Sequence, residues 1–182
     1  EHLVDVSDVK VDFSIERFDV DFYTSTKHTL SQTKEKYPFF FSSSTPDTLW
    51  INKIKDTDER VLFSETQKVY KDISFLSVEL EQLFQHIKYY NPAFNSPKVI
   101  TLLSNIDYQN NVLYTKEYLL ISLDVYLGAT HKFYADFPAY IKQNYTKKQI
   151  VVDVATAMIK TMLKKETSDR SFVGKMIQEG KQ

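Results

Sequence analysis

The stretch YLLISLDVYLGATHKFYADFPAYIKQNYTKKQIVVDVATAMIKTM, residues 118–162, organises the predicted fold. Residues 118–123 form a short apolar run of the length of a β-strand that is covered on at least one face. Gly128 ends the run, and an aromatic-rich crossing segment follows it. Thr146 and Gln149 then have the spacing of a capping box, which predicts a helix that begins at Thr146. Its apolar residues at helical spacing predict one buried face: Val151, Val154, Ala155, Met158 and Met162.

The composition is typical of one globular domain with a core, since 42% of the 182 residues are hydrophobic and 26% are charged. The net charge of −1 and the lack of a dense basic run give no support for a nucleic-acid partner. The sequence contains no cysteine, which excludes disulfides and thiolate chemistry within it. Aromatic residues make up 14%, which indicates aromatic core packing or, as the alternative, aromatic side chains at an interface.

The amino-terminal part is predicted to be a tether over residues 1–8, followed by a single domain over residues 9–182. Apolar and polar residues alternate over 9–16, which predicts a half-buried strand. Four acidic residues lie in or just after this strand: Asp12, Glu16, Asp19 and Asp21. They lack the central glycine and terminal glutamate of an EF-hand, so solvated charges are expected there rather than a metal site.

The middle of the chain carries the strongest helical signal, over residues 64–90, which predicts either one kinked helix or two. A shorter helix is predicted over 46–55, with a charged connector over 56–60. Ser64 and Gln67 have a second capping-box spacing, which predicts the start of the long helical region.

A second strand is predicted over residues 99–103, and it is expected to pair as a hairpin with the strand that begins at Val112. After the central stretch, Ser168 is predicted to cap a last helix that carries Phe172, Val173, Met176 and Ile177 on its inner face. Together these elements predict an α+β fold, in which helices pack on a mixed β-sheet.

The sequence carries no recognisable set of catalytic residues. A zinc peptidase would carry HExxH on the helix that here reads VVDVATAMIK, which has neither histidine nor glutamate. The four histidines have no ligand spacing, and no GxSxG elbow, P-loop or dinucleotide motif occurs. His131 is the best single candidate for a general base, with Asp124 and Asp136 close to it in sequence. We therefore expect a noncatalytic domain, with no cofactor and no metal.

Five phrases in order resemble the gliding-motility lipoprotein GldB family of Bacteroidetes-type bacteria: VKVDFSIERFDVDFY, ELEQLFQHIKYYNP, LDVYLGATHKFY, FPAYIKQNYTKKQIVVDVATAMI and SFVGKMIQEGK. The resemblance implies a periplasm-facing envelope protein that is lipid-anchored, needed for gliding and associated with type IX secretion. The lipidated cysteine of the family is not in this sequence, and family members typically continue beyond Gln182. More distantly, the family is similar to predicted zinc peptidases, which implies a metal-free relative of a zincin-like scaffold.

The resemblance implies protein partners, namely other envelope proteins of gliding and type IX secretion, and attachment to the membrane through an N-terminal lipid. The candidate partner-binding residues lie in the YLG turn and the crossing segment: Tyr126, Gly128, His131, Phe133, Tyr134, Phe137 and Tyr140. One alternative is a hydrolase that acts on envelope peptides or peptidoglycan, with His131 in its site. Another is a periplasmic ligand-binding protein that uses the aromatic cluster Phe133, Tyr134, Phe137 and Tyr140.

Overall fold

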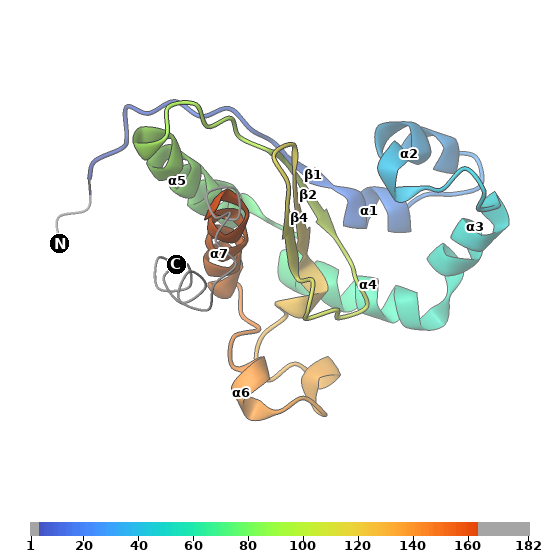
Figure 1. The fold of residues 1–182 in the computed structure, drawn as a ribbon. Helices are drawn as coiled ribbons and strands as arrows, with labels where there is room; N and C mark the ends of the chain where they lie inside the picture. The colour runs from blue at the N-terminus through green and yellow to red at the C-terminus, as the bar shows by residue number, and fades with distance from the viewer. Residues whose placement is uncertain (1–3, 164–182) are drawn as a thin grey trace, which may run out of the picture.

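The computed structural model describes residues 4–163, in which a four-stranded sheet lies between two groups of helices (Figure 1). The strands are β1 (Ile15–Arg17), β2 (Lys98–Leu102), β3 (Val112–Tyr114) and β4 (Tyr118–Ser122). Their order in the sheet is β1-β2-β4-β3. β1, β2 and β4 are parallel and β3 is antiparallel, so the sheet is mixed. The predicted α+β class is therefore confirmed.

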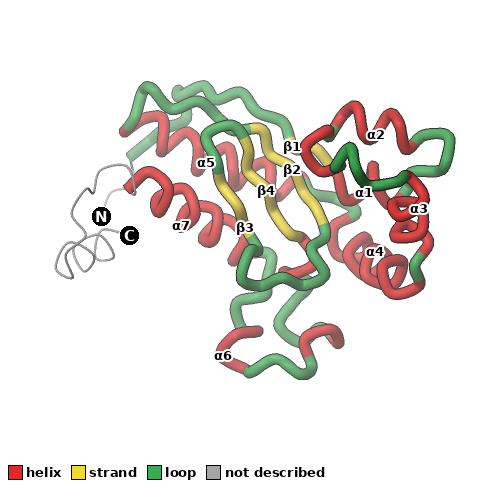
Figure 2. The backbone as a smooth tube through the Cα atoms, turned by 45° about the vertical axis from the view of Figure 1, so that its right-hand side comes forward, coloured by secondary structure: helices red, strands yellow, loops and turns green. Residues whose placement is uncertain are grey.

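One face of the sheet is covered by α5 (Ser74–Tyr90) and α7 (Gln149–Leu163), which lie side by side in Figures 1 and 2. Alternate residues of β4 point to this side, as the strand period requires, and Leu119 and Ile121 are completely buried there. They pack with Leu80 and Phe84 of α5 and with Val154 of α7. This layer forms the larger of the two hydrophobic cores.

The opposite face carries four helices: α1 (Phe18–Tyr23), α2 (Leu30–Lys36), α3 (Asp47–Lys55) and α4 (Thr57–Tyr70). Ile100 of β2 points to this side and belongs to a second core with Phe22, Tyr37 and Phe41. Phe22 and Phe41 lie 6.1 Å apart between ring centroids, within the range in which aromatic rings interact. Much of the high aromatic content is thus explained by core packing.

The amino-terminal strand is shorter than predicted. Only Ile15–Arg17 pair with β2, opposite Val99–Thr101, whereas residues 9–14 run on without sheet pairing. The alternation of apolar and polar residues over 9–14 has another cause than a strand, because Val11 and Phe13 pack on the core beside α5. The rings of Phe13 and Phe84 meet edge to face at 5.0 Å. Every second side chain is therefore half-buried here because the segment packs on a helix, not because it pairs in the sheet.

The predicted charged connector over 56–60 is wrong, because α4 begins within it. Asp56 caps this helix, with its Oδ1 accepting the N–H groups of Asp58 at 3.0 Å and Glu59 at 3.1 Å. Ser64 and Gln67 therefore lie inside α4 and form no capping box. The helical signal over 64–90 is resolved into two helices, α4 and α5, which are separated by residues 71–73.

The predicted hairpin between the second strand and Val112 is also wrong. β2 pairs with β4 in parallel, with Val99 opposite Leu119, and the hairpin is formed by β3 and β4. Thr115 stabilises the tight turn between them, since its N–H donates to the carbonyl of Tyr118 at 2.8 Å. The polar loop after β2 instead turns around Asp124, whose carboxylate accepts the N–H of Ser104 at 3.1 Å and of Ile106 at 2.6 Å.

Helix α7 begins at Gln149 rather than Thr146, because the predicted capping box does not form. The side-chain Nε2 of Gln149 donates to Asp153 Oδ1 at 2.9 Å, so it reaches forward along the helix instead of back. The predicted helix after Ser168 lies outside the described residues. Val6 is buried at 7% exposure although it falls in the predicted tether, while the division into residues 1–8 and 9–182 stays a prediction.

Candidate functional site

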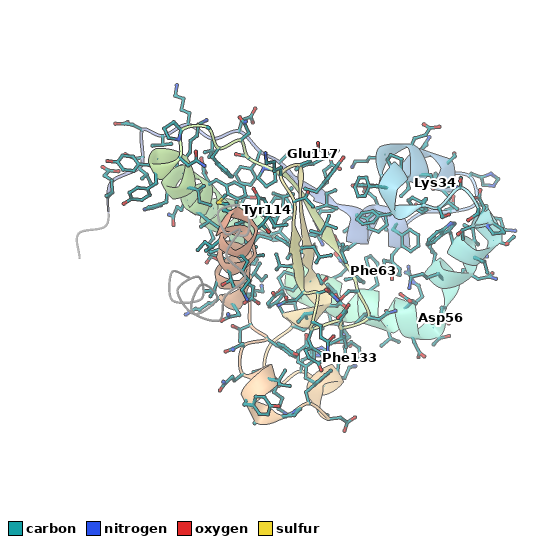
Figure 3. All side chains as sticks on the ribbon, viewed as in Figure 1. Lys34, Asp56, Phe63, Tyr114, Glu117 and Phe133 are labelled. Carbon is teal, nitrogen blue, oxygen red and sulfur yellow. The ribbon has the colours of Figure 1, made fainter. Side chains whose placement is uncertain are left out.

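The crossing segment, residues 126–145, links the end of the sheet to α7 and carries all seven candidate residues. It includes two short helices, η3 (Lys132–Tyr134) and α6 (Ala139–Lys142), and projects beyond one end of the sheet in Figures 1 and 2. Figure 3 shows Phe133 in this projection, far from Lys34 in the α1–α4 group. The candidates divide into residues that hold the segment in place and residues that lie at its surface.

Gly128 sets the path of the chain into the crossing segment. Its φ of +116° lies in the region that residues with a Cβ rarely adopt, while the space around it would admit a Cβ. Its N–H donates to the carbonyl of Tyr145 at 2.8 Å. The two ends of the segment are thereby joined by a backbone hydrogen bond, so the glycine has a conformational role.

Tyr126 is completely buried and connects the segment to α7. Its hydroxyl donates to Asp153 Oδ2 at 2.6 Å and accepts from Asn111 Nδ2 at 2.7 Å. Asn111 also donates to Asp153 at 2.8 Å, and the Tyr70 hydroxyl donates to the Tyr126 carbonyl at 2.6 Å. Burial, with the Asp153 carboxylate second, raises the pKa of Tyr126 far above its ordinary value. The hydroxyl therefore stays protonated as a structural donor.

Tyr134 is also completely buried, and its hydroxyl bridges two backbone groups. It donates to the carbonyl of Asp124 at 2.5 Å and accepts the N–H of Leu127 at 3.1 Å. Its ring meets that of Tyr145 edge to face at 4.9 Å. Burial raises the pKa of Tyr134 above its ordinary value. The side chain thus fixes the YLG turn from inside.

Replacing Tyr134 with phenylalanine is expected to lower the free energy of unfolding by about 1–3 kcal/mol, because a buried N–H and a buried C=O lose their partner. Urea unfolding measures this loss. Tyr140→Phe is the matched control, since Tyr140 is 71% exposed and a change there is expected to stay within about 0.5 kcal/mol. Equal losses for the two variants would contradict the bridging role.

His131 is held between the crossing segment and α4. Its Nδ1 accepts the N–H of Phe133 at 3.3 Å, and its Nε2 faces Glu65 Oε2 at 3.4 Å. The acid beside His131 is therefore Glu65, 66 residues away in sequence, which sequence spacing could not indicate. Asp124 instead has its carboxylate buried in the loop after β2, where desolvation raises its pKa, and Asp136 is exposed.

Glu65 also receives Lys68 and Lys132, each with Nζ at 2.9 Å from Oε1. The hydrogen bonds from Lys68 and then Lys132 lower the pKa of Glu65 to about 2. The Lys132 ion pair and the His131 contact therefore both fasten the crossing segment to Glu65 of α4.

The Glu65 cluster predicts a pH dependence of stability. The folded pKa of about 2 lies below the ordinary value of 4.5, so the unfolded state binds more protons and stability falls as the pH falls. Wild type should therefore exceed Glu65→Gln in Tm at neutral pH, and the margin should shrink as the pH falls from about 5 toward 2. Thermal unfolding from pH 7 to pH 2 measures it. Glu35→Gln, an exposed site with no ion pair in residues 4–163, should show no such trend.

The surface of the crossing segment is aromatic. Tyr140 is 71% exposed, while Phe133 and Phe137 are half-buried. Tyr108, at 40% exposure, lies edge to face with Phe137 at 5.5 Å and extends this surface to the loop after β2. The aromatic cluster of the ligand-binding alternative is therefore divided, since Tyr134 is in the core and Tyr140 faces solvent.

Cavities lie elsewhere on the molecule. One of about 720 Å³ is beside the end of α7, and one of about 610 Å³ lies against α3 and the start of α4. The residues that line them include none of Phe133, Tyr134, Phe137 and Tyr140. These packing details give the ligand-binding alternative no support at the crossing segment.

The acidic residues near β1 are separated by the fold. Asp19 is completely buried and bonded to Arg17, whereas Asp21 pairs with Lys36 at 2.8 Å at the surface. Within residues 4–163, no group of three or more histidine, cysteine, aspartate or glutamate side chains is placed to hold a metal ion. In the same range, no helix combines the length and the apolar character needed to cross a membrane.

The fold and the site define an α+β domain. Its crossing segment is held to α4 and α7 and carries aromatic side chains at its surface. The chain belongs to the family of gliding motility protein GldB, whose model matches residues 1–182, the whole chain. The predicted family is thus confirmed; it is a lipoprotein family and is not known as an enzyme family. No curated protein and no solved structure matches the chain. The relationship to a zincin-like scaffold therefore stays a prediction.

Proposed function

We propose that this chain is a noncatalytic domain of the cell envelope that serves gliding by binding other proteins of the gliding and type IX secretion machinery. Its family supports a role in gliding motility. The observation that supports binding is that aromatic side chains of the crossing segment reach its surface: Tyr140 is exposed, Phe133 and Phe137 are half-buried, and Tyr108 lies beside Phe137. We further propose that the domain faces the periplasm and is anchored to a membrane by an N-terminal lipid, as its lipoprotein family implies.

The way the segment is held supports a docking role. Buried hydrogen bonds of Tyr126 and Tyr134 and the charged contacts of Glu65 fix it at several points. A pre-organised surface loses little conformational freedom on binding, which favours affinity. Tyrosine is enriched at the centres of interfaces, because its ring is apolar and its hydroxyl can remain hydrogen-bonded.

Tyr140→Ala tests this proposal, because it removes an exposed ring without removing a buried contact. In cells that lack the native gene, the variant protein should fail to restore gliding while accumulating at the wild-type level. Tyr90→Ala is the matched control, since Tyr90 is also 71% exposed but lies at the end of α5. Normal gliding with Tyr140→Ala, or equal loss with Tyr90→Ala, would contradict the proposal.

A hydrolase is the second candidate, and the contact between His131 and Glu65 is the observation that favours it, since a carboxylate can orient a general base. It requires His131 itself for function. Loss of gliding with His131→Gln, in a protein that remains folded and still binds its envelope partner, would support the hydrolase. Restored gliding with that variant would contradict it and leave the binding function in place.

A further inference from the structure

A second surface, far along the chain from the crossing segment, combines an apolar floor with a basic rim. It is the cavity of about 610 Å³ bounded by the turn after α1, by α3 and by the first turn of α4. This volume falls within the range of about 300–1,000 Å³ that is usual for small-molecule sites. In Figure 3, Asp56 marks the start of α4 in this group of helices.

The floor of the cavity is formed by Tyr23, Ile51 and Ile54, which are 4%, 7% and 6% exposed. The Tyr23 hydroxyl is hydrogen-bonded to Glu59, so this residue offers the cavity chiefly its ring. The ring is held firmly, because it stacks on Phe63 at 5.2 Å between centroids. The floor is therefore apolar and suits a hydrocarbon group.

The rim carries four basic side chains, Lys27, His28, Lys55 and Arg60, and no carboxylate from residues 4–163 lines the cavity. Lys27 and Lys55 are exposed and make no ion pair within residues 4–163. Arg60 is oriented by its Nη1, which donates to the Tyr23 carbonyl at 2.7 Å. The other N–H groups of its guanidinium are suited to bind a carboxylate or a phosphate.

Asp56, Asp58 and Glu59 adjoin the cavity in sequence, but none of their side chains is among those that line it. Glu59 is paired with Lys53 and also accepts from Tyr23 and, at 3.2 Å, from Asn105. The Asp56 side chain caps α4. The side chains that line the cavity therefore place basic groups at the rim above an apolar floor.

From this combination we propose that the cavity binds an anionic amphiphile, a phosphate or carboxylate head group attached to a hydrocarbon chain. The head group is held by Arg60 with Lys27 and Lys55, and the first part of the chain lies on Ile51, Ile54 and the Tyr23 ring. Each half of the site matches one half of such a molecule. This inference is independent of the proposed protein contact at the crossing segment.

Isothermal titration calorimetry of the 182-residue chain with dodecyl phosphate, below its micelle concentration, tests the proposal. We expect saturable binding with one site, and binding about tenfold weaker in the variant Lys27→Glu/Lys55→Glu, because two attractive charges become repulsive. The control Lys71→Glu/Lys148→Glu changes the net charge equally at exposed positions outside the cavity and should bind within about twofold of wild type.

Two further ligands separate the contributions of charge and of hydrocarbon. Inorganic phosphate, which lacks the chain, and dodecyl maltoside, which lacks the charge, should each bind at least about tenfold more weakly than dodecyl phosphate. Equal binding of inorganic phosphate would overturn the role of the apolar floor. Equal binding of dodecyl maltoside, equal loss in the control variant, or no binding at all would overturn the proposed site.

Discussion

Replacing Asp19 with alanine is expected to lower the free energy of unfolding by about 3–5 kcal/mol, the cost of breaking a buried ion pair. Asp19 is completely buried, and its carboxylate makes a two-point contact with Arg17, Nε to Oδ1 at 2.9 Å and Nη2 to Oδ2 at 2.6 Å. It also accepts from Thr101 at 2.6 Å and from Gln67 at 3.0 Å. The alanine variant removes the carboxylate that these donors share and leaves Arg17, whose side chain is only 18% exposed, without a counter-ion.

The reason for this large effect is position as well as charge. The contacts of Asp19 join α1 to β2 and to α4, and Arg17 Nη1 also donates to the Tyr70 carbonyl at 3.0 Å. Urea unfolding followed by circular dichroism measures the loss. Asp47→Ala is the control, because it also removes an ion pair, the one with Lys34. Asp47 is 63% exposed, so a loss of at most about 1 kcal/mol is expected. Similar losses at the two sites would contradict the assigned role of Asp19.

Replacing Phe84 with alanine is expected to cost about 3–5 kcal/mol, as is usual when a buried phenyl ring is removed from a core. Phe84 is completely buried on the inner face of α5. Its ring lies 5.0 Å from Phe13 and 5.7 Å from Phe94, so it links the amino-terminal segment and the loop before β2 to the larger core. A cavity at this position would loosen three parts of the chain together.

Equilibrium unfolding of Phe84→Ala and Val78→Ala separates core packing from helix propensity. Val78 is 54% exposed on the same helix, and alanine is the better helix former, so its replacement should change stability by less than about 0.5 kcal/mol. A loss below about 1 kcal/mol for Phe84→Ala would show that the ring is not part of a close-packed core.

The elements that local pattern determines were predictable from the sequence. The strand at 118–122, the strand at 98–102 and the helix at 47–55 lie within a few residues of their predicted positions. Each is specified by apolar periodicity or by turn residues along a short stretch. The long apolar pattern over 64–90 likewise predicted helix correctly, although only the structure shows that it divides at residues 71–73.

Pairing and polar contacts between distant parts of the chain were not predictable. β2 and β4 pair in parallel although β3 lies between them in sequence, and the loop after β2 wraps the Asp124 carboxylate; no local pattern encodes either contact. The acid beside His131 is contributed by α4, and the partners of Tyr126 are on β3's edge and α7. The sequence does not show which aromatic residues of the crossing segment are buried. Tyr134, which is in the core, and Tyr140, which faces solvent, could therefore not be distinguished from the sequence.

The contact proposed at the crossing segment is tested most directly by crosslinking in living cells. A photoreactive amino acid placed at Tyr140 should form an adduct with an envelope protein in gliding cells that produce the full-length protein. The same amino acid at Tyr90, equally exposed at 71%, should not form that adduct. A defined adduct at position 140 alone is the result that we predict, and the absence of any protein adduct there, or the same adduct at both positions, would contradict it.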